Sequence, residues 1–169
     1  MPETYVLFEL AGTTYGLRTR DVQHMEMLEH ITPVPNTSPA VEGVIFSRGQ
    51  VVPALNLRVR FGLPREPHTM RSRLIIVQVQ QRLVGLIVDE AREFLAIPDE
   101  AIRSVQEAVT GLEGNYLKGI ATLGERLVLL LDLETTLDQG TAIQVPSLSE
   151  MTARVKALAE EKERQPAHN

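Results

Sequence analysis

The sequence predicts a fold that is mainly all-β and made of two like lobes, and the first reason is an internal repeat. Segment 8–17 (FELAGTTYGL) is answered by segment 77–86 (VQVQQRLVGL) at one constant offset, which places Phe8 on Val77 and Gly16 on Gly85. Self-similarity of this kind is a stronger guide to architecture than local propensity.

A second pair of segments supports the same prediction. Segment 41–57 is answered by segment 117–133, with Gly43 on Gly119 and Asn56 on Asp132. The offset is slightly larger here, so the second copy contains a short insertion. We therefore expect two lobes related by a pseudo-dyad, with a seam between them at which a functional site would lie.

The composition limits the class of protein. With 43% hydrophobic and 23% charged residues, the 169-residue chain is of ordinary globular composition. The absence of cysteine excludes disulfides and thiolate zinc sites, and the net charge of -5 disfavours nucleic acid and anionic membranes as partners. The longest purely apolar run, Leu127 to Leu131, is too short to span a bilayer, and Met1–Tyr5 shows no signal-peptide pattern. We expect a cytoplasmic protein with no direct membrane insertion.

The first half contains signals for two hairpins and a short helix. Residues 5–17 predict a β-hairpin around Gly12. Asp21 is placed to cap a helix over residues 22–28, and the prolines of 31–35 require extended backbone. Residues 44–57 predict two strands around a tight turn at Ser47–Gln50.

The second half repeats this pattern after an arginine- and proline-rich connector, residues 58–73. Residues 74–88 predict a hairpin around Gln80–Arg82, and residues 97–103 predict a short helix or turn near Asp99. Residues 116–133 predict a third hairpin with its turn at Gly124–Arg126.

The end of the chain differs in kind, and we divide the chain into a two-lobed β domain (1–139), a linker (140–146) and a helical tail (147–169). Ser147 to Glu150 is a capping-box pattern. The tail helix would carry one apolar stripe, formed by Leu148, Met151, Val155 and Leu158. This stripe could pack on its own β domain, or it could dock a partner or a second copy of the chain through self-association.

The sequence contains no recognisable catalytic, metal-binding or cofactor-binding motif, so we predict a protein that is not an enzyme and uses no cofactor. Phosphate loops and nucleophile elbows are absent, and the spacing of His24 and His30 does not place two ligands on one helix face. The carboxylates of Asp89, Glu90, Glu93, Asp99 and Glu100 predict a solvated face; an enzyme would have to draw its acid and base from them.

Basic residues cluster in the connector, which contains Arg58, Arg60, Arg65, Arg71 and Arg73. A small β-barrel nucleic-acid binder is the alternative that this series suggests. A solvated connector, or charge matched to an acidic partner protein, fits the acidic chain better.

The order and spacing of many residues resemble the CheW-like chemotaxis coupling proteins. The matching residues are Val34-Pro35, Pro39, Val41–Val44, Arg48-Gly49, Val52–Arg58, Phe61-Gly62, Val84–Asp89, Tyr116–Leu123 and Arg126–Leu133. The resemblance runs from about Tyr5 to Leu137 and implies a pair of intertwined five-stranded SH3-like barrels. One departure is Phe46-Ser47, which stands where the family usually has Asn-Leu.

The resemblance also implies a function and partners. Family members are non-enzymatic adaptors that couple the cytoplasmic tips of chemoreceptors to the regulatory domain of a histidine kinase, in arrays at the inner membrane. By position, Val22, Val44, Arg48 and Gly49 would lie on or near the receptor groove at the seam. Leu74, Ile76 and Leu86 are the candidates for kinase contact. An adaptor of a non-flagellar pathway, such as pilus motility or development, is the alternative within this class.

Overall fold

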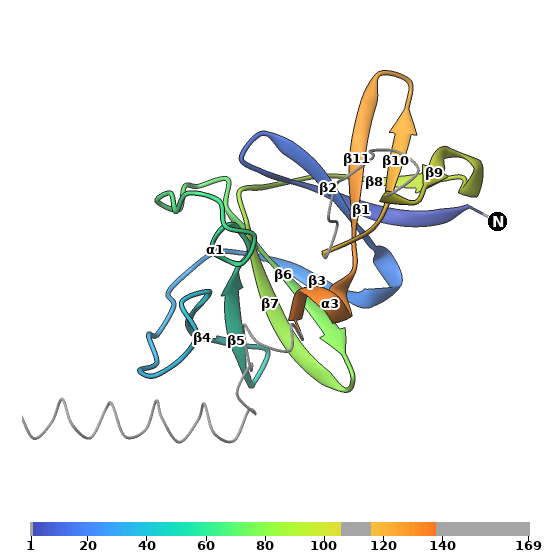
Figure 1. Cartoon of the computed structure of the whole chain (residues 1–169). Helices are drawn as coiled ribbons and strands as arrows, with labels where there is room; N and C mark the ends of the chain where they lie inside the picture. Colours follow the sequence, from blue (N-terminus) through green and yellow to red (C-terminus); the bar gives the residue numbers. More distant parts are fainter. Residues whose placement is uncertain (1, 106–115, 138–169) are drawn as a thin grey trace, which may run out of the picture.

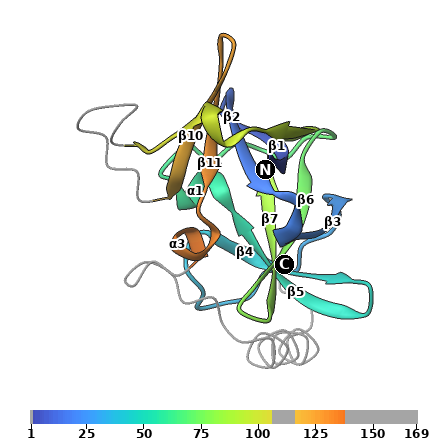
Figure 2. The same cartoon turned by 90° about the vertical axis from the view of Figure 1, so that its right-hand side faces the viewer.

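The protein, seen in a computed structural model, is built mainly of strands in two mixed sheets (Figures 1 and 2). The structure describes residues 2–105 and 116–137. The six-stranded sheet has the order β8 (Glu90–Ile97), β1 (Glu3–Leu10), β2 (Thr13–Arg18), β11 (Arg126–Leu131), β10 (Leu117–Leu123), β9 (Ile102–Arg103). The five-stranded sheet has the order β3 (Val22–Met27), β6 (Arg73–Val79), β7 (Arg82–Val88), β5 (Gln50–Asn56), β4 (Val41–Ser47).

The two sheets are intertwined, because each takes strands from both halves of the repeat. The first hairpin, β1–β2, lies in the six-stranded sheet, whereas its repeat, β6–β7, lies in the five-stranded sheet. The later hairpins are exchanged in the opposite sense: β4–β5 joins β6–β7, and β10–β11 joins β1–β2. The two sheets therefore share one strand order. The run β8-β1-β2-β11-β10 of the six-stranded sheet corresponds, strand by strand, to the run β3-β6-β7-β5-β4 of the other. The predicted pair of like β-lobes is confirmed at this level.

Two repeated glycines lie where the halves meet. Gly16 of β2 pairs in parallel with Leu130 of β11, and Gly85 of β7 pairs in parallel with Ala54 of β5. A Cβ atom at Gly16 would lie 3.1 Å from the Leu130 side chain, and one at Gly85 would lie 2.8 Å from that of Leu74. The repeat retains glycine because a larger residue would clash with packed side chains.

Another repeated position caps a short helix after each second hairpin. The side chain of Asn56 accepts a hydrogen bond from the backbone N–H of Arg58 at 2.9 Å, at the start of α1 (Leu57–Arg60). Asp132 accepts one from the N–H of Thr135 at 3.1 Å, at the start of α3 (Leu133–Leu137). Both are short polar side chains suited to the N-cap.

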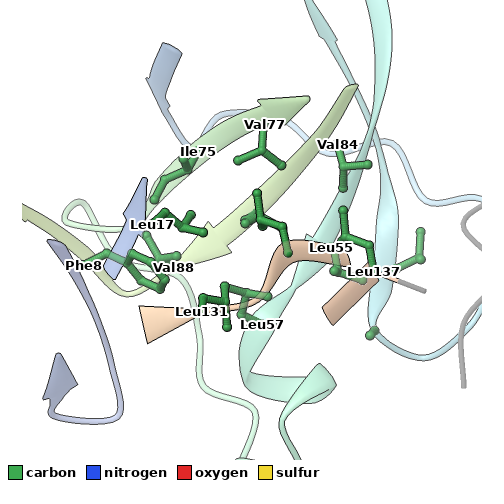
Figure 3. Packing of buried hydrophobic residues seen from close by; sticks show 14 of the residues in the cluster. Phe8, Leu17, Leu55, Leu57, Ile75, Val77, Val84, Val88, Leu131 and Leu137 are labelled. Carbon is green, nitrogen blue, oxygen red and sulfur yellow. The ribbon is translucent and has the colours of Figure 1, made fainter. Parts of the chain in front are cut away.

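The core has three parts, and the largest fills the seam. Residues of both sheets pack there, including Phe8 and Leu17 from one sheet and Val77 and Val84 from the other (Figure 3). A second cluster lies among strands of the six-stranded sheet, around Leu7. The third lies among strands of the five-stranded sheet. Burying each large apolar side chain contributes about 1.5–3 kcal/mol, so the seam stabilises the pairing of the two lobes.

The helix expected over residues 22–28 is wrong, because Val22–Met27 form strand β3. A β-bulge between Val22 and His24 inserts one extra residue opposite β6. Val22 and Met25 can therefore both pack against the seam core, although three residues apart. This spacing mimics a helical period. Asp21, the expected helix cap, instead ends a 3-10 turn, Thr19–Asp21, and accepts a hydrogen bond from Arg18.

The sequence interpretation also missed β8, whose residues Glu90 to Glu93 were assigned only to a solvated face. This strand pairs with β1 at one end of its sheet, and most of its side chains are exposed or half-buried. The other expected hairpins are confirmed, as is a short 3-10 turn at Asp99–Ala101. The predicted linker and tail lie outside the described residues. Within the described part, no helix is long and apolar enough to cross a membrane.

Candidate partner-binding site

The predicted Arg48-Gly49 turn forms the tip of the β4–β5 hairpin. Ser47 pairs with Gln50, so Arg48 and Gly49 are the two loop residues, and their φ angles are 48° and 81°. Positive φ at both positions is typical of the tight turns that match strand twist. Both residues are exposed, and the Arg48 guanidinium is therefore accessible to a partner.

Beside this turn, a polar cluster joins the two edge strands of the five-stranded sheet. His24 Nε2 lies 2.5 Å from a carboxylate oxygen of Glu26 on the same strand, β3. Ser47 Oγ, at the end of β4, donates a hydrogen bond to that same oxygen and lies 3.2 Å from His24 Nε2. The sheet edges β3 and β4 are thus linked through side chains, and Arg48 follows the linking serine directly.

The electrostatics of Glu26 depend on this cluster. Partial burial alone would raise the pKa of the Glu26 carboxyl group, but hydrogen bonds from Ser47 and His24 and the charges of His24 and Arg48 outweigh that effect. The pKa is lowered overall. Glu26 therefore stays ionised, and its negative charge on β3 interacts with the positive charge of Arg48 at the turn.

One face of the β4–β5 hairpin runs from the seam core to this turn. Val44 is buried in the seam cluster, whereas Phe46, two residues further along the same face of β4, is 75% exposed. Val51 of β5 pairs with Phe46 and is half-buried. We name Val44, Phe46 and Val51 the hairpin face. It continues the apolar surface of the core into solvent.

The four predicted receptor-groove residues occupy two places. Val44 is buried, and Val22 packs against the same seam cluster from the start of β3. Arg48 and Gly49 lie at the hairpin tip. The hairpin face connects the two places through Phe46, and the cluster of His24, Glu26 and Ser47 lies beside it. Sequence reasoning missed this cluster because it treated residues 22–28 as a helix; on a strand, His24 and Glu26 share a side.

The three predicted kinase contacts are core residues. Leu74 and Ile76 belong to the cluster inside the five-stranded sheet, and Leu86 belongs to the seam cluster; each is at most 1% exposed. Their side chains are covered by the protein itself. The exposed large apolar side chains among the described residues are Met27, Phe46, Met70, Phe94 and Leu127.

The connector makes ion pairs within the chain. Arg58 donates to both oxygens of Asp89, at 2.8 and 2.5 Å, and Asp89 also accepts from the N–H of Ala11. Burial would raise the pKa of Asp89, but these hydrogen bonds and the charge of Arg58 lower it. Arg65 and His68 both contact Glu42, at 3.0 and 2.8 Å. Arg58 and Arg65 are thus engaged with carboxylates, Arg58 with Asp89 and Arg65 with Glu42.

Two open cavities adjoin these elements. One of about 430 Å³ lies beside β2, the β6–β7 turn and α3, and has charges of both signs on its walls, including Arg18, Asp21 and Lys118. The other, of about 530 Å³, lies beside the Glu42–His68 pair. Within residues 2–105 and 116–137, no group of three histidine or carboxylate side chains is arranged to hold a metal ion.

Comparison with known proteins gives a consistent family assignment. The model of the CheW-like domain matches residues 4–141. A chemotaxis protein CheW of Klebsiella aerogenes is 32% identical over 80% of this chain and 81% of its own length, and one of Bacillus subtilis is 31% identical over 83% and 90%. The crystal structure of the scaffolding protein TtCheW from Thermoanaerobacter tengcongensis superposes with a TM-score of 0.78 at 30% identity, covering 86% of this chain and 99% of that one. The chain therefore belongs to the family of CheW-like domains.

Proposed function

We propose that this chain is a non-enzymatic adaptor of a chemotaxis-type pathway, coupling the cytoplasmic tip of a chemoreceptor to the regulatory domain of a histidine kinase. The observation that carries the proposal is the family match over residues 4–141, together with relatives named as chemotaxis proteins. An adaptor of this kind works in the cytoplasm, at receptor arrays, and transmits a signal only by differential affinity. It must bind one conformation of the receptor or kinase better than another.

For the receptor, we propose the surface that includes Val22, Val44, Arg48 and Gly49, with Phe46 of the hairpin face at its exposed centre. Its chemistry is that of an interface with an apolar core and a charged rim. Val44 and Val22 support the apolar part from the seam, and Arg48 supplies a cation for a receptor carboxylate.

For the kinase, we propose the outer strands β3 and β8, because they occupy equivalent positions in the two sheets. Each is an end strand, and each carries an exposed apolar side chain: Met27 is 58% exposed and Phe94 is 61% exposed. The buried residues Leu74 and Ile76 then act indirectly, by supporting β6, which pairs with β3, and Leu86 supports β7, which pairs with β6. The kinase would meet apolar side chains of both lobes.

The SH3-like barrel form of each lobe is the finer part of this proposal. It is supported by the contacts of Ser47 on β4 with Glu26 and His24 on β3, which join the two edges of the five-stranded sheet. In the other sheet, Arg126 at the β10–β11 turn reaches Glu93 on β8 at 3.0 Å.

Calorimetric titration of the chain into the isolated regulatory domain of each chemosensory kinase of the same genome tests the function. We expect saturable one-to-one binding to one of them. Met27→Asp and Phe94→Asp should each weaken binding at least about tenfold, since a buried charge at an interface is costly. Met70→Asp is the matched control, because Met70 is 87% exposed in the connector. No binding by a folded chain to any of these domains would contradict the adaptor proposal.

A further inference from the structure

The hairpin face exposes an apolar surface that nothing in the described structure covers. Phe46 is 75% exposed, yet it lies between Val44, which is 4% exposed, and the turn at Arg48. Val51 lies opposite Phe46 and extends the apolar area across both strands. An exposed aromatic side chain that adjoins a buried apolar core is a candidate interaction site.

The described chain ends beside this face. Leu137, the last described residue, is 8% exposed and belongs to the same cluster as Val44, Leu55 and Val84. Figure 3 shows Leu55, Val84 and Leu137 close together at one end of the seam. The remaining residues, 138–169, therefore start from the base of the β4–β5 hairpin.

The remaining chain is long enough to reach the hairpin tip. Eleven residues separate Leu137 from Leu148 in numbering, and an extended chain spans up to about 3.3–3.6 Å per residue, or about 36–40 Å. The seven residues of β4 span about 23 Å. A segment that begins near residue 147 can thus lie along the whole hairpin face.

The sequence of this segment fits an apolar surface. Leu148, Met151, Val155 and Leu158 recur at spacings of three, four and three, which would form one stripe on a helix. A stripe of this kind needs a partner surface, and tethering to the same chain gives an effective concentration in the millimolar range for a short flexible connection. The hairpin face, which lies near the start of this connection, therefore meets the tail at a higher effective concentration than a surface on a second molecule would.

We propose that residues 147–158 of this chain lie on its own hairpin face, with the apolar stripe covering Phe46. This inference rests on the proposed function for its consequence: the covered face includes the surface proposed for the receptor. The tail would therefore compete with the receptor and reduce its apparent affinity. If the face is covered nine-tenths of the time, the apparent dissociation constant rises about tenfold.

The lack of cysteine in the chain allows a direct test. We would introduce cysteine pairs into the full chain and follow disulfide formation under mild oxidation on a non-reducing gel. Phe46→Cys with Val155→Cys should cross-link rapidly within one chain. Phe46→Cys with Ala153→Cys tests the opposite side of the same predicted helix, and Phe94→Cys with Val155→Cys tests an exposed apolar position in the other sheet. Both controls should react at least about tenfold more slowly, because the proposed position of the tail holds only the Phe46–Val155 pair close together and so raises only its effective concentration.

Equal rates in all three pairs would overturn the proposal, because they would indicate that the tail has no preferred position on the β domain. Cross-linking between two chains would also overturn it, in favour of self-association. Circular dichroism melting of each variant shows that the β domain is intact. Since no receptor is present, this test stands even if the proposed function fails.

A second test measures the competition. Val155→Asp in the full chain places a charge in the stripe, so affinity for the isolated receptor tip should rise about tenfold. Ala153→Asp is the matched control and should leave affinity unchanged. An unchanged affinity for Val155→Asp would contradict the covering role of the tail. If no variant bound the receptor tip, the receptor proposal would be contradicted instead, and the cross-linking result alone would decide the position of the tail.

Discussion

Ser47 at the end of β4 donates a hydrogen bond to Glu26 of β3, and this contact joins the two edge strands of the five-stranded sheet. Ser47 is 5% exposed, so the bond lies away from solvent although it is next to the exposed turn. The turn that carries Arg48 is thereby fixed to the opposite edge of its own sheet. A change in the cluster should affect both the stability of the lobe and the position of Arg48.

Ser47→Ala should destabilise the protein by about 1–3 kcal/mol, because it removes a donor from a partly buried carboxylate. Urea denaturation with the midpoint and slope measured separately would show this loss. Gln50→Ala is the matched control: Gln50 pairs with Ser47 across the same turn but is exposed, so its replacement should be nearly neutral. Equal losses for the two variants would contradict a specific role of the Ser47–Glu26 bond.

Stability should decrease in acid. The pKa values of Glu26, Glu42 and Asp89 are all lowered in the folded protein, despite the opposing effect of burial. A lowered folded pKa gives stability that is fully present above the unfolded value, about 4, and lost as the pH falls through the folded value. Urea midpoints measured between pH 7 and pH 3 should therefore stay level and then fall below about pH 4. Asp89→Asn should show a shallower fall than the parent chain.

Gly43→Ala should destabilise the protein more than Gly119→Ala, although the two glycines are repeat counterparts. A Cβ atom at Gly43 would lie 2.0 Å from the backbone oxygen of Thr32, and φ there is 154°. At Gly119 the nearest atoms are a side-chain carbon of Ile102 at 3.0 Å, which can shift, and the backbone oxygen of Arg103 at 3.1 Å, a much milder approach than at Gly43. Overpacking costs about 1–3 kcal/mol, and we expect Gly43→Ala to exceed that range. Thermal melts followed by circular dichroism would rank the two, and the reverse order would refute this explanation.

Arg48→Gly should weaken receptor binding while leaving the fold intact. Glycine accepts the positive φ of 48° at this position, so the turn is retained and only the guanidinium is lost. Binding to the receptor tip, measured by calorimetry, should fall by about tenfold to a hundredfold, the range expected for a charge-assisted hydrogen bond. Arg20→Ala removes another exposed arginine and is the control. A lower melting temperature for Arg48→Gly would instead indicate a structural role.

The sequence predicted the fold well where periodicity and repetition agreed. The repeated positions Gly16 and Gly85, and Asn56 and Asp132, correspond to close strand approaches and helix caps. The prediction failed at β3, because the bulge after Val22 imitates helical spacing. It also failed at β8, where an end strand with one solvated side carries many charges and resembles a loop.

The site was predictable only in part. The Arg48-Gly49 turn follows from local sequence, because Gly49, which accepts positive φ, lies between two apolar strand-like segments. The contact of Ser47 with Glu26 joins residues 21 positions apart and depends on how the sheet closes, which no local pattern reports. The resemblance suggested Leu74 and Ile76 as kinase contacts, but both faces of β6 are covered by core clusters, which the sequence of one strand does not report.

The exchange of hairpins between the two sheets also determines when each lobe can be completed during synthesis. The five-stranded sheet lacks two of its three inner strands, β6 and β7, until the ribosome has passed Val88. The six-stranded sheet begins with β1 but needs β11, which ends at Leu131. The lobe whose strands are made first is thus finished last, and its closure requires contacts between residues far apart in the chain. Such contacts slow folding, so β1–β2 remains a two-stranded hairpin, a state of marginal stability, until β8 has been made and can pair with β1.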